Sequence, residues 1–163
     1  MAEKIDVPEI AGCTCLLARR TTRQLTQIYD AALEPVELTI NQFGVLAHLY
    51  GSTLDGRGHL SIGALADLIG KHASTLNRDL KPLGDRGFVT DTHDPADRRL
   101  RVVRITAKGR AQLRKAIPNC RQAEAQIRKS LGAKTVLALS DLLELASARL
   151  VRERSYKLSS DSR

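Results

Sequence analysis

The segment 61–89 constrains the fold more than any other part of the chain, because it joins two amphipathic helical patterns through a single glycine. The small residue Ala66 lies four positions before Gly70, and the apolar residue Leu76 lies six positions after it. A glycine suits a tight turn that requires a positive φ angle. The small residue permits a close helix crossing, and the leucine anchors the second helix in a core. This spacing predicts a helix-turn-helix.

The second helix, expected from about His72 to Asp85, has a polar face opposite its apolar one. Apolar side chains recur at helical spacing along it: Leu76, Leu80 and Leu83. The outward side chains offer the hydroxyl, amide and guanidinium groups that contact base edges and phosphates in a major groove about 12 Å wide. We therefore expect DNA contacts from Ser74, Thr75, Asn77, Arg78 and Lys81. The alternative is an ordinary solvated face with Ser74 as a helix cap.

A β-hairpin is expected directly after this helix. Two short strands, 88–90 and 101–105, flank a polar loop that contains Pro95. Arginines crowd its second half: Arg98, Arg99, Arg101 and Arg104. A loop tipped with arginine suits a narrow minor groove, where the negative potential of DNA is concentrated.

Within this hairpin, Arg98 and Arg99 are expected nearest the tip and are predicted DNA contacts. Arg101 is included among the contacts, although it and Arg104 lie on a strand, where phosphate contact and internal pairing are both open. Asp97 is expected to orient an arginine or to cap the turn, since a carboxylate that faces phosphate is repelled.

The basic charge of the chain points to the same partner. The net charge is +8 over 163 residues, and residues 71–115 hold twelve basic and five acidic side chains, a surplus of seven. Neutralisation of phosphates by such clusters drives nucleic-acid binding. The scarcity of aromatic residues argues against a protein that stacks single-stranded bases. Double-stranded DNA is therefore the expected partner.

Two further helices are expected upstream of this lobe. The first runs over 9–34, where Pro35 ends it. The second begins at Thr39, which forms a capping box with Gln42, and is expected to stop at Gly51.

Two long helices are expected downstream. Thr106 caps the first, which Pro118 kinks or breaks before about residue 131, and Gly132 separates it from a last helix over 133–153. Apolar residues over 136–150 form a stripe that is too wide for a lone helix to bury. Pro82, inside the expected recognition helix, should bend that helix and has no functional explanation.

These residues resemble the winged helix-turn-helix regulators of the MarR family. The likeness is carried by LADLIGKHASTLNRDLKPLGDRGFV (65–89), by DPADRRLRVVRIT (94–106) and by the AKGRAQL that follows. The wing pattern of the family is present as Asp97, Arg98, Arg99, Ile105-Thr106 and Gly109. The resemblance implies a mainly α fold with a small β-hairpin wing, one domain over 1–163. In it, 36–105 form the winged helix-turn-helix lobe, and 9–34 and 106–153 form a helical dimerisation region.

The resemblance also implies a function. It is that of a homodimeric transcriptional regulator, most often a repressor, whose two recognition helices face successive major grooves of a palindromic operator. In this family a small aromatic or phenolic anion often binds between the dimer helices and the DNA-binding lobe and releases the DNA. Arg19, Arg20 and Arg23 on the first helix are candidate partners for such an anion.

Thiol-based sensing of oxidants is an alternative mode of release. Cys13 and Cys15 lie near the start of the first helix, and Cys120 lies in a later one. In a related peroxide-sensing branch of the family, a first-helix cysteine pairs with a cysteine of the partner subunit. A thiol near a helix N-terminus can have a lowered pKa, but a free cysteine also serves as a small apolar core residue.

Other classes of protein find little support. The sequence has no Gly-rich phosphate loop, HExxH motif or nucleophile elbow, so neither an enzyme nor a cofactor is expected. The histidines, His48, His59, His72 and His93, lack the paired spacing of a metal site. With no apolar segment of membrane-spanning length and no signal segment, a cytoplasmic protein without membrane contact is expected. An architectural DNA-binding protein that has no effector is the alternative from another class.

Overall fold

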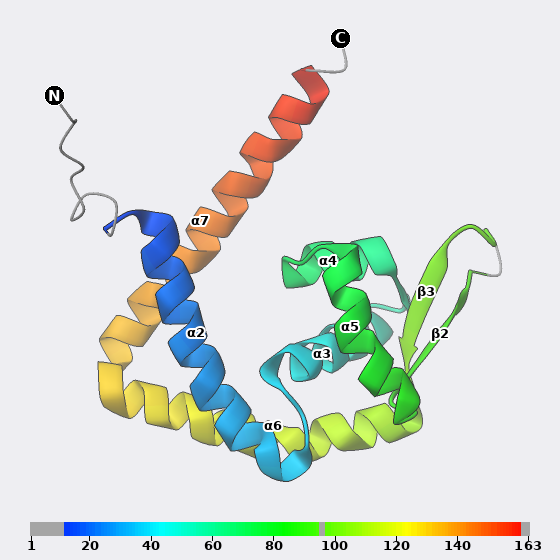
Figure 1. Cartoon of the computed structure of the whole chain (residues 1–163), viewed down its shortest axis with the longest axis horizontal. Coiled ribbons are helices and arrows are strands. Elements are labelled where there is room, and N and C mark those ends of the chain that lie inside the picture. The colour runs from blue at the N-terminus through cyan, green and yellow to red at the C-terminus, as the bar shows by residue number, and fades with distance from the viewer. Residues whose placement is uncertain (1–11, 95–96, 161–163) are drawn as a thin grey trace, which may run out of the picture. The chain divides into compact units, whose positions relative to one another are not determined.

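The chain is mainly helical and carries one small antiparallel sheet (Figure 1). The computed structural model describes residues 12–94 and 97–160, and their side chains as far as residue 151. Two compact units divide the chain, residues 1–123 and 124–163. Within the described ranges, no helix is long and apolar enough to cross a membrane. The mainly α fold class with a β-hairpin wing is confirmed.

The first unit opens with helix α2 (Thr14–Leu33), and the expected start of that helix at 9–11 lies outside the described residues. A 3-10 turn, η1 (Glu34–Val36), connects it to helix α3 (Ile40–Leu54). The predicted capping box is present. The hydroxyl of Thr39 accepts from the backbone N–H of Gln42 at 3.2 Å, and Oε1 of Gln42 accepts from the backbone N–H of Thr39 at 3.1 Å.

The expected end of this helix at Gly51 is wrong. The helix continues for three residues, and the backbone N–H of Asp55 closes it on the carbonyl of Gly51. A glycine inside a helix costs only about 1 kcal/mol. The extra turn offsets that cost because Ser52 is buried in it, with its hydroxyl donating to the carbonyl of Leu49 at 2.8 Å.

The helix-turn-helix consists of α4 (Ile62–Ile69) and α5 (Ala73–Asp85), as expected. The hydroxyl of Ser61 caps α4 by accepting from the backbone N–H of Ala64 at 3.1 Å. Gly70 ends it with a φ of 71°, in the left-handed region that the turn requires.

Pro82 lies within α5 without ending it. A proline in a helix interior costs about 3 kcal/mol. Burial of a leucine side chain is worth about 1.5–3 kcal/mol, and Leu76, Leu80 and Leu83 are all buried in this helix. The packing of the apolar face therefore outweighs the cost of the proline.

The sheet has three strands in the order β1-β3-β2 and not the two of a simple hairpin. They are β1 (Leu60–Ser61), β2 (Val89–His93) and β3 (Arg101–Ile105). Strand β1, which is two residues long, was not expected, and the expected end of β2 was too early. Residues 91–93 were expected in the loop, but they pair with 101–103 across the ladder. Val102 and Val103 of the central strand β3 point to opposite faces of the sheet, and both are buried.

Helix α6 (Ala107–Leu131) runs through Pro118, so of the two possibilities left open a break is excluded. Gly132, with a φ of 82°, separates it from α7 (Ala133–Ser160). The expected end of α7 near residue 153 is wrong, because the polar residues that follow include neither Gly nor Pro and polarity alone does not stop a helix.

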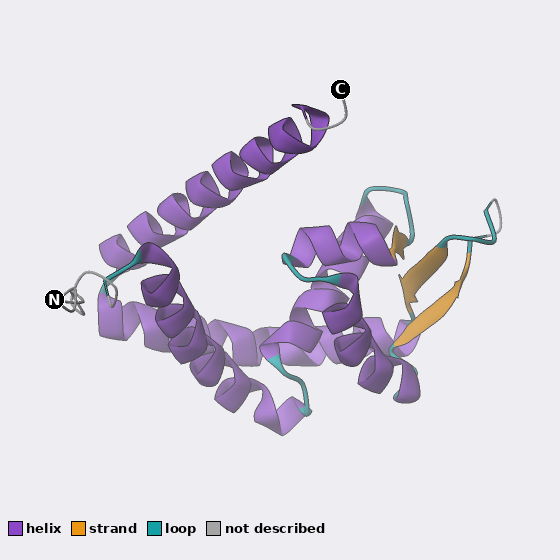
Figure 2. Ribbon diagram, turned by 45° about the horizontal axis from the view of Figure 1, so that its top comes forward, coloured by secondary structure: helices purple, strands orange, loops and turns teal. Residues whose placement is uncertain are grey.

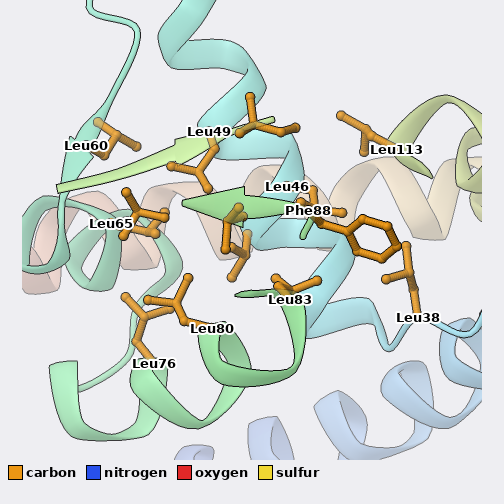
Figure 3. Packing of buried hydrophobic residues seen from close by; sticks show 14 of the residues in the cluster. Leu38, Leu46, Leu49, Leu60, Leu65, Leu76, Leu80, Leu83, Phe88 and Leu113 are labelled. Atoms are coloured by element: carbon orange, nitrogen blue, oxygen red, sulfur yellow. The ribbon is translucent and has the colours of Figure 1, made fainter. Parts of the chain in front are cut away.

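The core of the first unit lies where α3, α4, α5 and the sheet converge (Figure 3). Leu46 and Leu49 of α3 pack with Leu65 of α4 and Leu83 of α5, and all four side chains are fully buried. The hairpin extends from this core past the helices in both views (Figures 1 and 2). The core therefore fixes α5 and the base of the hairpin together and leaves the outer face of each open.

Candidate nucleic-acid interface

Helix α5 turns its polar face to solvent. Ser74, Asn77, Arg78 and Lys81 are exposed, whereas Thr75 is partly covered. No carboxylate among the described residues pairs with Arg78, so its guanidinium is free for a partner. The backbone N–H groups of the first turn of a helix also favour an anion, and α5 has no side-chain cap at His72 to occupy them.

An ion pair that the sequence did not reveal braces the turn against this helix. Nζ of Lys71 lies 2.6 Å from Oδ2 of Asp79, and each side chain is only about a fifth exposed. Lys71 directly follows the turn glycine, while Asp79 lies in the middle of α5. Helical periodicity assigns charged residues to the solvent, so no sequence pattern could indicate this pair.

Lys81 is bonded within the same helix. Its Nζ lies 2.9 Å from Oδ2 of Asp85, one turn further on, and both side chains are well exposed. The hydrogen bond with Asp85, and then the attraction of its charge, raise the pKa of Lys81. Lys81 thus stays protonated, and a phosphate would compete with Asp85 for it.

The tip of the wing exposes Arg98 and Arg99. Oδ1 of Asp97 accepts from the backbone N–H of Arg99 at 2.9 Å, and the carbonyl of Asp97 accepts from the N–H of Leu100 at 2.9 Å. This carboxylate therefore closes the turn through the backbone and leaves both guanidinium groups pointing to solvent.

Arg101 differs from its neighbours because it is paired across the hairpin. Its Nε donates to Oδ1 of Asp91 at 3.2 Å, and its Nη2 donates to the other carboxylate oxygen. Phosphate contact and internal pairing were both open for Arg101, and in this structure it is paired internally. The pair lines an open groove of about 390 Å³ between the hairpin and α5, together with Asn77 and Lys81.

The three arginines of α2 lie in one groove. Arg19, Arg20 and Arg23 are exposed and line an open surface depression of about 680 Å³, which Cys15 also lines. Cys13 and Cys15 are both exposed, whereas Cys120 is half-buried beside the core. Burial raises the pKa of the Cys120 thiol. The structure therefore places the three candidate anion partners beside one candidate thiol, Cys15. Cys120 differs from the other two thiols because it is half-buried and its pKa is raised.

A third and smaller cavity, of about 210 Å³, is lined by residues of α3 and α6: Tyr50, Arg110, Leu113, Arg114 and Ile117. No group of three or more metal-ligating side chains occurs in the described part of the chain.

Comparison with known proteins finds similarity among solved structures only. A scan against protein-family models gives no match, and a search of curated proteins gives none either. Among solved structures, the chain is similar to the M. tuberculosis transcriptional regulator MosR in complex with DNA. The two are 35% identical over 83% of this chain and 97% of that one, with a TM-score of 0.68.

Two other solved structures are similar at lower identity. BpsR of Bordetella bronchiseptica, whose DNA binding is regulated by 6-hydroxynicotinic acid, is 26% identical over 84% of this chain and 94% of its own, with a TM-score of 0.71. The transcriptional repressor CouR, bound to a 23-mer DNA duplex, is 25% identical over 89% of this chain and 99% of its own, with a TM-score of 0.72.

A helix-turn-helix followed by a hairpin and flanked by long helices defines a winged helix-turn-helix regulator. The chain belongs to the MarR family of transcriptional regulators. Membership of this family also shows that the protein is not an enzyme.

Proposed function

We propose that this regulator is a repressor that binds a palindromic operator as a homodimer and leaves it when a small aromatic anion binds. The proposal rests on two exposed surfaces that occur together. One is the polar face of α5, where Arg78 has no carboxylate partner among the described residues, and the other is the wing tip with Arg98 and Arg99. In this arrangement Asn77 and Arg78 contact bases in the major groove. Arg98 and Arg99 enter the adjacent minor groove.

Within the DNA-binding surface, the remaining assignments follow from the contacts. Ser74 and Thr75 at the start of α5 contact phosphate through hydroxyl and backbone N–H groups. Lys81 reaches phosphate by leaving Asp85. Arg101 does so only by leaving Asp91, so we assign it the weakest contribution of the predicted contacts. MosR and CouR, which were solved with DNA, support DNA as the partner.

A homodimer is supported by apolar side chains that the chain does not cover. Along α7, exposed fractions of 48–65% are found for large apolar residues: Leu137, Leu142, Leu143, Leu145, Leu150 and Val151. Leu16 and Leu17 of α2 are also more than 40% exposed. A single chain rarely leaves so many apolar residues open. We therefore assign 9–34 and 106–153 to dimerisation and 36–105 to DNA binding.

The effector is proposed to be a small aromatic carboxylate. The groove at Arg19, Arg20 and Arg23 offers three guanidinium groups, which suit the bidentate binding of a carboxylate. Regulation of BpsR by 6-hydroxynicotinic acid supports this chemical class.

Oxidation is the second candidate for release. It is favoured by one observation: Cys13 and Cys15 are both exposed, two residues apart, where α2 begins. Peroxide treatment followed by a non-reducing gel tests it. A cysteine-dependent change in mobility together with loss of DNA binding is expected under this mode. Unchanged mobility and unchanged binding would leave the small anion as the only candidate.

The test of the main proposal is selection of duplexes from randomised DNA by the full chain, followed by footprinting. A protected palindrome and a dimeric mass in solution are expected. Protection without sequence preference, governed by salt alone, would indicate an architectural DNA-binding protein instead. Aromatic carboxylates are then added to the complex, and the expected result is dissociation that Arg20→Ala weakens.

A further inference from the structure

Side chains from distant parts of the sequence hold the short connector between α2 and α3. Nε2 of Gln112, from α6, donates to the carbonyl of Val36 at 2.6 Å. Nη1 of Arg86, at the end of α5, donates to the carbonyl of Glu37. A third bond joins the two helices on either side of the connector, since Oδ1 of Asp30 in α2 accepts from the backbone N–H of Ile40 at the start of α3, at 2.7 Å. Two elements remote in sequence thus hold the backbone of the connector.

Arg86 makes the strongest of these attachments. Besides the carbonyl of Glu37, its guanidinium reaches Oε2 of the same residue at 3.1 Å, and it stacks over the ring of Phe88 at 4.6 Å from the ring centre. Its side chain is 31% exposed. A bond from a charged donor, an ion pair and a cation–π contact converge on one group. Arg86 is therefore part of the basic window 71–115 by sequence, but its charge is paired with Glu37 at the surface.

The connector is strained where Arg86 binds it. Glu37 has a φ of 51°, and it is the one non-glycine residue of the described chain in the left-handed region. Its N–H donates back to the carbonyl of Glu34 at 2.8 Å, which makes the turn tight. A non-glycine residue keeps this backbone conformation only where its surroundings hold it. Here Arg86 holds Glu37, because it binds both the carbonyl and the carboxylate of that residue.

We infer that Arg86 is a positioning residue, which fixes the recognition helix against α2 and thereby sets the spacing of DNA half-sites that the dimer accepts. The inference rests on the proposed function, since α2 belongs to the proposed dimerisation region. When two recognition helices are joined rigidly, the second binds as if at high effective concentration, but only at the matching spacing. A looser join broadens the accepted spacing and lowers the affinity at the best one.

The experiment measures affinity for a set of duplexes that carry the selected palindrome with base pairs added or removed at its centre. One base pair moves a half-site by about 3.4 Å and turns it by about 34°. The wild-type chain is expected to lose affinity about tenfold or more for each base pair added or removed, and Arg86→Ala about threefold or less. Compared with wild type, Arg86→Ala should lose most affinity at the best spacing. Affinity of Arg86→Ala for a duplex that carries one half-site should stay within about twofold of wild type, because a positioning residue does not itself contact DNA.

Lys108→Ala provides the matched control. Nζ of Lys108 lies over the same Phe88 ring, at 5.5 Å from its centre, and no bond joins it to the connector among the described residues. This variant loses the same charge and should keep the wild-type spacing profile. Gln112→Leu removes the other donor to the connector and should flatten the profile as Arg86→Ala does, which covers the case in which Arg86→Ala does not fold.

The outcomes separate the role of Arg86 from the dimer on which it depends. A spacing profile that stays steep in both Arg86→Ala and Gln112→Leu would overturn the role of Arg86. So would an equal loss on single half-sites and full palindromes, because that result identifies Arg86 as a phosphate contact. A wild-type chain that binds single half-sites as tightly as palindromes would instead contradict the dimer itself.

Discussion

The hydroxyl of Thr106 accepts a hydrogen bond from the backbone N–H of Gly109 at 3.0 Å and donates to the carbonyl of Gly87 at 2.7 Å. One side chain thus caps α6 and fastens its first turn to the start of the wing. A Cβ atom at Gly109 would overlap the carbonyl oxygen of Phe88 and lie 2.9 Å from Cγ1 of Ile105. The Thr and the Gly three residues later in the wing pattern therefore have a steric reason.

Gly109→Ala is expected to destabilise the protein by about 1–3 kcal/mol, the usual cost of overpacking a closed site. Gly63 is the control, because it lies in α4, where a Cβ atom would meet nothing within 4 Å, and it has an ordinary negative φ. Gly63→Ala should be neutral or stabilising by up to about 1 kcal/mol. Urea unfolding followed by circular dichroism measures both, and equal effects would contradict the steric explanation.

Arg78→Ala tests the recognition helix. It should cost about 1–3 kcal/mol on the selected operator and relax the base preference at one position of each half-site. The measurement is a titration against the operator and its single-base variants. Equal weakening on all sequences would identify Arg78 as a phosphate contact.

Arg99→Ala tests the wing. A cation in the minor groove neutralises nearby phosphates, so its loss should lower the slope of log K against log salt concentration by about 0.9. Arg101→Ala is the comparison, and its effect should be smaller, because Arg101 is already bonded to Asp91. An unchanged slope in Arg99→Ala would remove this residue from the interface.

Leu143→Glu tests the proposed dimer. Leu143 is 53% exposed on the apolar stripe of α7, and a buried carboxylate at an interface should shift the protein towards monomer. Ala148 lies about 140° around the helix from Leu143, on the side where Asp141 and Glu144 also lie. Ala148→Glu adds the same charge on that acidic side and should weaken the dimer less than Leu143→Glu does. Light scattering after gel filtration gives the two masses. Dimers in both variants would show that this side of α7 is not the interface.

Alkylation distinguishes the three thiols. Exposed Cys13 and Cys15 should react with iodoacetamide at a pH of about 7.5 before Cys120, which is half-buried. Burial raises the pKa of Cys120, so less of it is thiolate at a given pH, and its rate should rise only at higher pH. Mass spectrometry of the peptides gives the rates, and the chain in urea serves as the reference in which all three should react alike.

Local signals predicted the helix-turn-helix well. The capping box at Thr39 and the left-handed Gly70 each depend on residues within a few positions, and each is present as expected. The errors arose where the outcome depends on distant packing. The burial of Ser52 extends α3 beyond Gly51, and pairing with β3 turns Leu60 and Ser61 into a strand.

The predicted interface residues divide in the same way. Exposure of Asn77, Arg78, Arg98 and Arg99 follows from helical and hairpin periodicity, which the sequence contains. The ion-pair partners of Arg101 and Arg86 cannot be predicted from periodicity. Asp91 and Glu37 come close to these arginines only after the chain folds back. A count of charge over 71–115 treats Arg86 as equal to its neighbours, whereas in the structure it is paired with Glu37 and with the connector before α3.

Ser61 belongs at once to two structures, since it is paired with Val102 in the sheet and supplies the cap of α4. Strand β1 thus joins the wing to the first helix of the helix-turn-helix near the loop end of the ladder, one residue pair before His93 and Arg101. Because β1 pairs with β3 at Val102 and Val103, the hairpin and the first helix of the helix-turn-helix are expected to move as one body when the protein binds DNA. A substitution that breaks the Ser61–Val102 pairing should therefore change how the wing is oriented relative to α4.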